Sequence, residues 1–153
     1  MGLAPWTVRG GICATRSIGS SAETLVQTGQ AQMILLDTNA LLWLATGHRR
    51  AAPLRVYAGQ LRVSPATLLE LAYLIEVGSA SVKGGVDRFR SDPRWDIDEI
   101  SSVDWFEIAE SIVWTREPFD RLIVAHAKRR KWRLATGDSK ICDHLRASEL
   151  IEL

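Results

Sequence analysis

Short runs of hydrophobic residues alternate along this chain with longer stretches that have helical spacing. The first clear run, 33–36, is apolar at every position, which is typical of a strand buried on both faces of a parallel sheet. Further strands are predicted at 61–63, 97–100 and 132–136, with an edge strand at 150–153.

The intervening stretches are predicted to be helices, and several have recognisable start and stop signals. Thr38 or Asn39 can cap the first helix and Gly47 can end it, while Ser64-Pro65 is a helix start. The predicted helices span 40–46, 64–77, 82–90, 102–114, 117–131 and 139–145. Strands that alternate with helices in this way predict an α/β fold, with a parallel sheet sandwiched between helices.

The first 32 residues differ in composition from the remainder. They are rich in Gly, Ser, Thr and Ala, contain little charge and show no sustained apolar period. We expect them to be a disordered extension, or to lie upstream of a natural start at Met33. The folded domain is expected to span 33–153.

Composition sets only broad limits on function. The net charge of +1 gives no whole-molecule attraction for nucleic acid. Two cysteines, Cys13 and Cys142, do not make a disulfide framework in a chain of 153 residues, so a cytoplasmic setting is expected. No apolar run approaches the roughly 20 residues of a membrane span, and no membrane association is expected.

Four carboxylates interrupt hydrophobic stretches at strand–helix junctions or just inside helices. They are Asp37, Glu70, Asp120 and Asp138. Such groups are costly in apolar surroundings, and if they converge they repel one another by about 3 kcal/mol per pair at an effective dielectric near 20. A hard divalent cation such as magnesium removes both costs. In parallel sheets ligands bind beyond the carboxyl ends of the strands, where Asp37 and Asp138 are expected to lie.

Each carboxylate also has a purely structural interpretation. Asp37 could cap the helix after its strand, although Thr38 and Asn39 are equally able caps. Glu70 lies in a helix that is apolar nearly all round and therefore predicted to be buried, where an arginine could pair with it. The first turn of a helix suits the charge of Asp120, and Asp138 sits in a tight turn where Asp is common. The four together favour a metal-dependent active site.

Four segments of the sequence resemble a known family in combination and in order. They are Leu35–Trp43, Val63–Leu71, Arg116–Ala127 and Leu134–Asp138. These segments resemble the PIN-domain family, and within it the VapC-type toxin ribonucleases of type II toxin–antitoxin modules. The resemblance covers about residues 33–153.

The resemblance implies a three-layer α/β/α sandwich and cleavage of RNA that depends on Mg²⁺ or Mn²⁺. Asp37, Glu70, Asp120 and Asp138 carry over as the catalytic and metal-binding carboxylates. Thr136 carries over as an accessory polar group near the substrate.

Two residues depart from the family pattern, and both are expected beside the acidic set. Glu117 stands where Asp is usual, and His126 stands where Gln is common. Arg121 is expected to hold a carboxylate by ion pairing. Members of the family are typically homodimers neutralised by a cognate antitoxin, so the resemblance implies both partners here.

The hypothesis is therefore a metal-dependent endoribonuclease, the toxin of a toxin–antitoxin pair. An alternative is a catalytically silent PIN-like module that binds RNA or protein. A phosphatase with Asp37 as nucleophile is less favoured, because that chemistry usually needs an acid where Asn39 stands.

Overall fold

The computed structural model describes residues 32–153, so the prediction for residues 1–32 lies almost entirely outside the described residues. The strands are β1 (Ile34–Leu36), β2 (Leu61–Val63), β3 (Asp96–Ile97), β4 (Arg133–Thr136) and β5 (Leu150–Glu152). The helices are α1 (Thr38–Thr46), η1 (Arg49–Tyr57), α2 (Pro65–Glu76), α3 (Asp87–Arg90), α4 (Ser102–Ser111), α5 (Pro118–Arg130), α6 (Ser139–His144) and η2 (Ala147–Glu149), where η marks a 3₁₀ helix. None of these helices is long and apolar enough to span a membrane.

The five strands form one sheet in the order β3-β2-β1-β4-β5, and all four pairings are parallel. The central strand β1 is fully buried, as its unbroken apolar sequence predicts. Ile34 and Leu36 pack into one hydrophobic core and Leu35 into the other, because successive side chains of a strand point to opposite faces. The chain moves outward from β1 to β3 and returns to β4 on the other side of β1, which makes the β1–β4 boundary a topological switch point.

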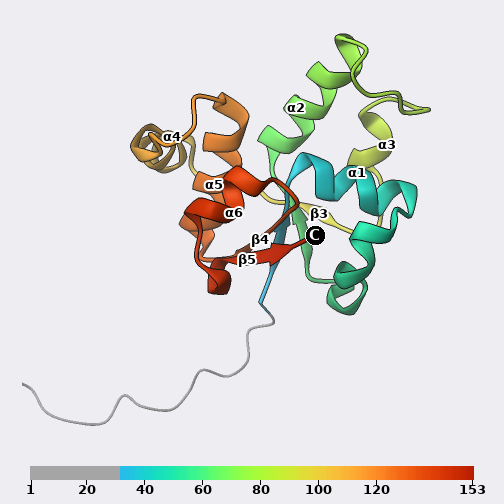
Figure 1. Ribbon diagram of the computed structural model, residues 1–153. Coiled ribbons are helices and arrows are strands. Elements are labelled where there is room, and N and C mark those ends of the chain that lie inside the picture. The colour runs from blue at the N-terminus through green and yellow to red at the C-terminus, as the bar shows by residue number, and fades with distance from the viewer. Residues whose placement is uncertain (1–31) are drawn as a thin grey trace, which may run out of the picture.

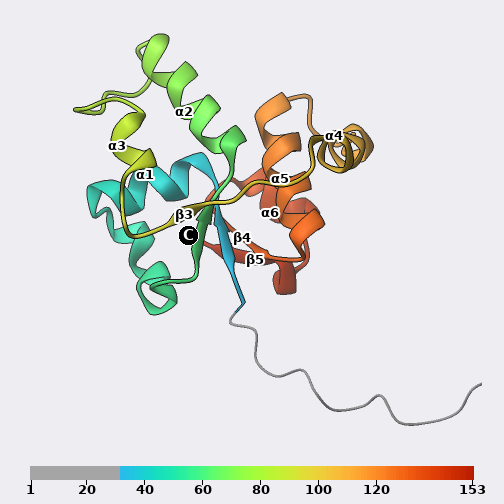
Figure 2. The same cartoon turned by 180° about the vertical axis from the view of Figure 1, so that it is seen from behind.

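Helices cover both faces of the sheet, which confirms the predicted α/β/α arrangement. In Figures 1 and 2, α1, α2 and α3 lie on one side of the sheet and α4, α5 and α6 on the other. The first core contains residues of α1, η1, α2 and α3, and the second residues of α4, α5 and α6.

Three details of the predicted elements are wrong. The helix predicted over 82–90 is reduced to α3, because Gly84 and Gly85 adopt positive φ angles of 90° and 60°. The helix predicted to reach 114 ends at Ser111. The strand predicted over 97–100 is the two-residue strand β3, Asp96–Ile97. Of the three candidate caps of α1, Asp37 is the residue that caps it.

The apolar sequence of α2 predicted a helix buried on all sides, but one side of α2 is exposed. Leu69, Tyr73 and Val77 follow one another at helical spacing and are 60%, 52% and 51% exposed. The opposite side of the helix, with Leu68 and Leu71, enters the core. Glu70 therefore lies at the border between the buried and exposed sides and is half-buried.

Candidate active site

Asp37 and Asp138 extend from the two strands that meet at the switch point. The Asp37 N–H donates to the carbonyl of Ala135 on β4 at 3.1 Å, which joins the ends of β1 and β4. Each carboxylate caps the helix that follows it: Asp37 Oδ1 accepts from the Ala40 N–H at 2.5 Å, and Asp138 Oδ1 from the Ile141 N–H at 3.1 Å. A helix cap can also be a candidate site residue here, because a strand end and a helix start lie at the same edge of the sheet.

Thr136, the last residue of β4, connects these two acids. Its hydroxyl oxygen accepts from the Asp138 N–H at 3.0 Å, and its side chain forms a hydrogen bond with Asp37. The side chain is fully buried. Thr136 therefore holds the Asp37 carboxylate and the backbone of Asp138, and its predicted contact with substrate stays a prediction.

Glu70 reaches the site from α2 and is paired with a hydroxyl group. Thr38, at the start of α1, donates a short hydrogen bond to Glu70 Oε2. Within the part of the chain that the structure describes, no Lys or Arg forms an ion pair with Glu70. The structural alternative of a pairing arginine is therefore wrong.

Asp120, in the first turn of α5, is held by the loop that precedes this helix. The buried Thr115 hydroxyl donates to Asp120 Oδ2 at 3.1 Å and accepts from the Glu117 N–H at 3.2 Å. Arg121 does not pair with a carboxylate anywhere in residues 32–153; its Nε donates to the Thr115 carbonyl at 2.7 Å. Arg121 thus supports Asp120 through the loop and not by direct ion pairing.

Burial and repulsion raise the pKa of the Asp37 carboxyl to about 6. Removal from water is the largest cause, since it disfavours the charged form. The hydrogen bonds from Thr136 and Ala40 oppose the shift, while repulsion from Glu70 and Asp138 adds to it. The two neighbouring acids are therefore close enough to act on Asp37 electrostatically.

The remaining acids are linked by the same repulsion. Burial raises the pKa of Glu70, and repulsion from Asp120 and Glu117 adds to this. Burial also raises the pKa of Asp120, with repulsion from Asp138 and Glu117 adding to it and Lys140 opposing it. The structure thus brings all four predicted carboxylates into one electrostatic group at the carboxyl edge of the sheet.

The model of the PIN domain family matches residues 34–145 of this chain. The protein belongs to the PIN-domain family. The match includes all four carboxylates and every strand except β5.

Solved structures share the fold of this PIN domain. One is a toxin–antitoxin complex from Klebsiella pneumoniae, with 22% identity, coverage of 78% of this chain and 99% of that chain, and a TM-score of 0.57. VapBC2 from Rickettsia felis, bound to a DNA fragment from its promoter, matches with 21% identity, coverage of 78% and 98%, and a TM-score of 0.57. VapC20 from Mycobacterium tuberculosis, described as a sarcin–ricin loop cleaving toxin, matches with 15% identity, coverage of 74% and 96%, and a TM-score of 0.52. No curated protein matches the chain.

Sequence reasoning missed one residue that acts on this site, Lys140, whose charge acts on Asp120. Glu117 acts on Glu70 and Asp120 and so lies beside the acidic group, as predicted. His126, also expected beside the acids, forms its hydrogen bonds with other residues: its Nδ1 is 3.0 Å from Ser64 Oγ and its Nε2 is 2.8 Å from Asp98 Oδ2. It belongs to the continuous buried run 123–127 of α5.

The chemistry of the donor set fits a divalent cation, although the side chains do not converge on a single point. Carboxylate oxygens are the preferred ligands of Mg²⁺ and Mn²⁺, and all four groups lack a cationic ion-pair partner within the described chain. Across residues 32–153, no three His, Cys, Asp or Glu side chains are arranged so that they could hold a metal ion as they stand. Metal binding would therefore need side-chain rotation.

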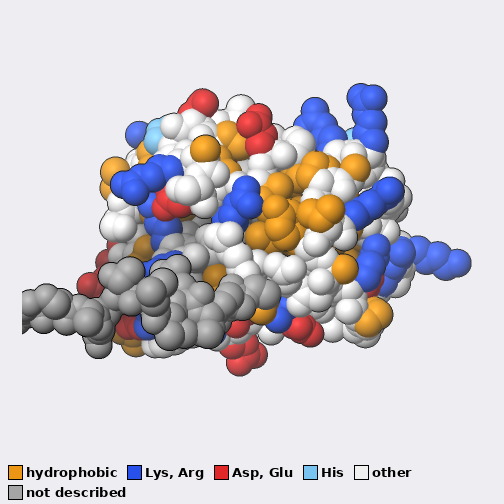
Figure 3. Space-filling view, turned by 90° about the horizontal axis from the view of Figure 1, so that it is seen from below, with side chains coloured by type: hydrophobic (Ala, Val, Ile, Leu, Met, Phe, Trp, Pro, Cys, Tyr) orange, Lys and Arg blue, Asp and Glu red, His pale blue; other side chains and the backbone are white. Residues whose placement is uncertain are grey.

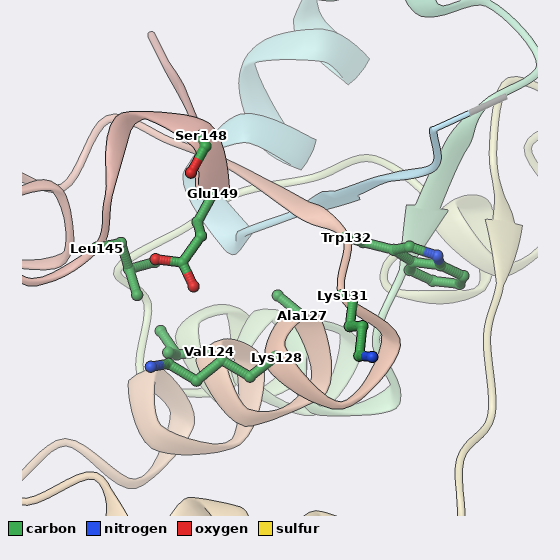
Figure 4. A pocket seen from close by; sticks show the side chains of 8 residues that line it. All are labelled: Val124, Ala127, Lys128, Lys131, Trp132, Leu145, Ser148 and Glu149. Carbon is green, nitrogen blue, oxygen red and sulfur yellow. The ribbon is translucent and has the colours of Figure 1, made fainter. Parts of the chain in front are cut away.

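One enclosed space lies at the other end of the domain. A cavity of about 290 Å³ lies between the C-terminal part of α5 and the segment before β5 (Figure 4), whereas Asp120 is at the start of α5. Its lining combines apolar Val124, Ala127 and Leu145 with Lys128 and other polar side chains. The lower face of the molecule carries hydrophobic side chains beside a group of Lys and Arg side chains (Figure 3), also away from the end of β1 where Asp37 lies. Neither feature belongs to the acidic site.

Proposed function

We propose that this PIN-domain protein is a divalent-metal-dependent endoribonuclease and the toxin of a toxin–antitoxin pair. The observation that supports this is the group of four acids, from four separate segments, at the switch-point edge of the sheet. Such repelling charges, which form no ion pair within residues 32–153, are costly in a site that performs no chemistry.

Asp37, Glu70, Asp120 and Asp138 would hold one or two Mg²⁺ or Mn²⁺ ions. A bound divalent ion supplies positive charge that lowers the pKa of water and offsets charge on the phosphate. The proposed reaction is hydrolysis: a bond forms between the water oxygen and phosphorus, and the P–O3′ bond breaks. The water proton leaves to a base and the O3′ atom gains a proton, so that 5′-phosphate and 3′-hydroxyl ends result.

The chain's own residues would orient the reactants. Helix caps and hydrogen bonds with Thr136 hold Asp37 and Asp138 at the switch-point edge of the sheet. Glu70 is half-buried, which leaves it accessible, and its raised pKa makes its carboxylate a stronger acceptor for the water proton than an ordinary glutamate. Glu70 would either complete the metal-binding set or orient the water.

A cognate antitoxin, a second copy of the chain and a cytoplasmic setting belong to the same proposal. The resemblance to VapC-type toxins supports them, as does the shared fold with the toxin–antitoxin complexes from Klebsiella pneumoniae and Rickettsia felis. Light scattering of the purified chain tests the homodimer, since a mass near 17 kDa would correspond to a single chain.

A silent PIN-like module that binds RNA or protein is the second candidate. The arrangement of the acidic side chains favours it, because within residues 32–153 they do not converge into a group that could hold a metal as they stand. Cleavage and binding assays separate the two candidates.

The test is incubation of the full chain, freed of any antitoxin, with end-labelled structured RNA in Mn²⁺. Matched reactions contain excess chelator or the Asp37→Asn variant. Cleavage that disappears in both controls supports a metal-dependent ribonuclease, with the variant slower by at least about a hundredfold. RNA binding without cleavage in either Mn²⁺ or Mg²⁺ would instead favour the silent module.

A further inference from the structure

Lys140 is the basic side chain that acts on the acidic group. It lies in α6, two residues after Asp138, and is exposed. Its charge opposes the repulsion that Asp120 experiences from Asp138 and Glu117. Within residues 32–153 it forms no ion pair with any carboxylate, so its charge is not neutralised by direct contact.

Thr115 holds the Lys140 ammonium beside the site. Lys140 Nζ donates to Thr115 Oγ1 at 3.3 Å, and the same hydroxyl donates to Asp120 Oδ2 at 3.1 Å. The Thr115 side chain is buried and also accepts from the Glu117 N–H. The ammonium is thereby one hydroxyl group away from Asp120, at the rim of the acidic group.

An ammonium has three N–H donors, and Thr115 accepts only one of them. An RNA backbone that approaches this edge meets at least five carboxylates, Glu117 included, and is repelled by them. A cation at the rim with uncommitted donors offsets that repulsion and can bind a phosphate oxygen. Arg121 cannot do so with its Nε, which is bound to the Thr115 carbonyl.

We propose that Lys140 is a phosphate-binding residue that places the RNA backbone against the acidic site, with Thr115 fixing its Nζ. The proposal rests on the proposed function, because it assigns the substrate contact of the same site. The contact is to phosphate and does not distinguish bases.

The test measures binding of the full chain to two single-stranded RNA oligonucleotides of different sequence by fluorescence anisotropy, with chelator present so that no metal contributes. Lys140→Gln is expected to raise the Kd about tenfold for both RNAs, as the loss of one charge-assisted contact implies. The slope of log Kd against log salt concentration should fall by about 0.7, the value for one phosphate contact on a single strand. Lys140→Arg should restore both quantities.

Lys128→Gln is the matched control, because this exposed lysine lines the cavity at the far end of α5. An unchanged Kd and salt slope for Lys140→Gln, or an equal effect of Lys128→Gln, would overturn the proposal. If RNA binding depends on Lys140 but the chain does not cut RNA, the role of Lys140 is supported and the proposed ribonuclease function is not. If Lys140→Gln cleaves RNA with the same kcat/KM as wild type, the role of Lys140 is overturned and the proposed ribonuclease function stands.

Discussion

At the scale of single residues, Asp37 serves the fold and the site at once. Its side chain caps α1, and it is only 5% exposed. Its pKa of about 6 lies above the ordinary value of 3.8, mainly because of burial. The charged form is therefore less stable in the folded chain than in the unfolded chain, so Asp37 lowers the stability of the metal-free protein at neutral pH.

Replacement of Asp37 by Asn should stabilise the metal-free protein at pH 8 while it removes activity. Between pH 3.8 and about 6 the folded state holds a proton that the unfolded state has released, so wild-type stability falls as pH rises through this window. Across this window the raised pKa of Asp37 lowers the unfolding free energy by about 3 kcal/mol, at 1.36 kcal/mol per pKa unit. Urea unfolding in chelator at pH 4 and pH 8 measures it, with the variant losing less stability between the two pH values than wild type does. An equal pH dependence of both proteins would contradict the assigned pKa.

The Thr115 hydroxyl stabilises the loop before α5 through its hydrogen bonds with Asp120 and the Glu117 N–H. Replacement by Val keeps the shape but leaves Asp120 and the Glu117 N–H without their partner, which should cost about 1–2 kcal/mol of unfolding free energy. Thr115→Ser keeps the hydroxyl group and should lose less. Urea unfolding of both variants checks this, and equal losses would show that the methyl group, and not the hydroxyl group, matters.

At the scale of elements, the turn from β4 to α6 is closely packed at Gly137. A Cβ atom at Gly137 would lie 2.5 Å from Cη2 of Trp43 on α1 and 3.2 Å from the Leu153 carbonyl. No side chain fits there without movement of the tryptophan ring or of the turn that positions Asp138.

Gly137→Ala should therefore destabilise the protein by about 1–3 kcal/mol and lower its Tm. Gly59→Ala is the control, because its Cβ would meet nothing within 4 Å and only its positive φ of 81° opposes the change. Thermal unfolding compares the two variants. A smaller loss at Gly137 than at Gly59 would mean that the Trp43 ring moves aside at little cost.

At the scale of the whole molecule, the repulsion among the acids predicts that divalent ions stabilise the fold. Binding to the native state alone raises the unfolding free energy by about 2.7 kcal/mol when free ion is at a hundred times its Kd. Thermal unfolding in chelator and in increasing Mn²⁺ measures this, and Asp37→Asn should lose most of the increase. A Tm that does not respond to Mn²⁺ or Mg²⁺ would argue against a metal site at these residues.

The sequence alone determined the α/β alternation, the parallel sheet and the positions of Asp37 and Asp138 at strand–helix junctions. These follow from local signals, since periodicity and cap residues act within a few positions of one another. The apolar run of β1 and the Ser64-Pro65 start of α2 are examples, and both are borne out.

Only the tertiary structure decided which side chains meet. The Thr38 hydroxyl donates a hydrogen bond to Glu70, 32 positions further along the chain. Lys140 donates a hydrogen bond to Thr115, 25 positions earlier in the chain. His126 was expected near the acids and lies instead between Ser64 and Asp98. Contacts of this kind depend on how helices pack across a sheet. The pattern of apolar residues along the chain shows which side of a helix is apolar, but not what covers that side. The exposed apolar side of α2 is an example.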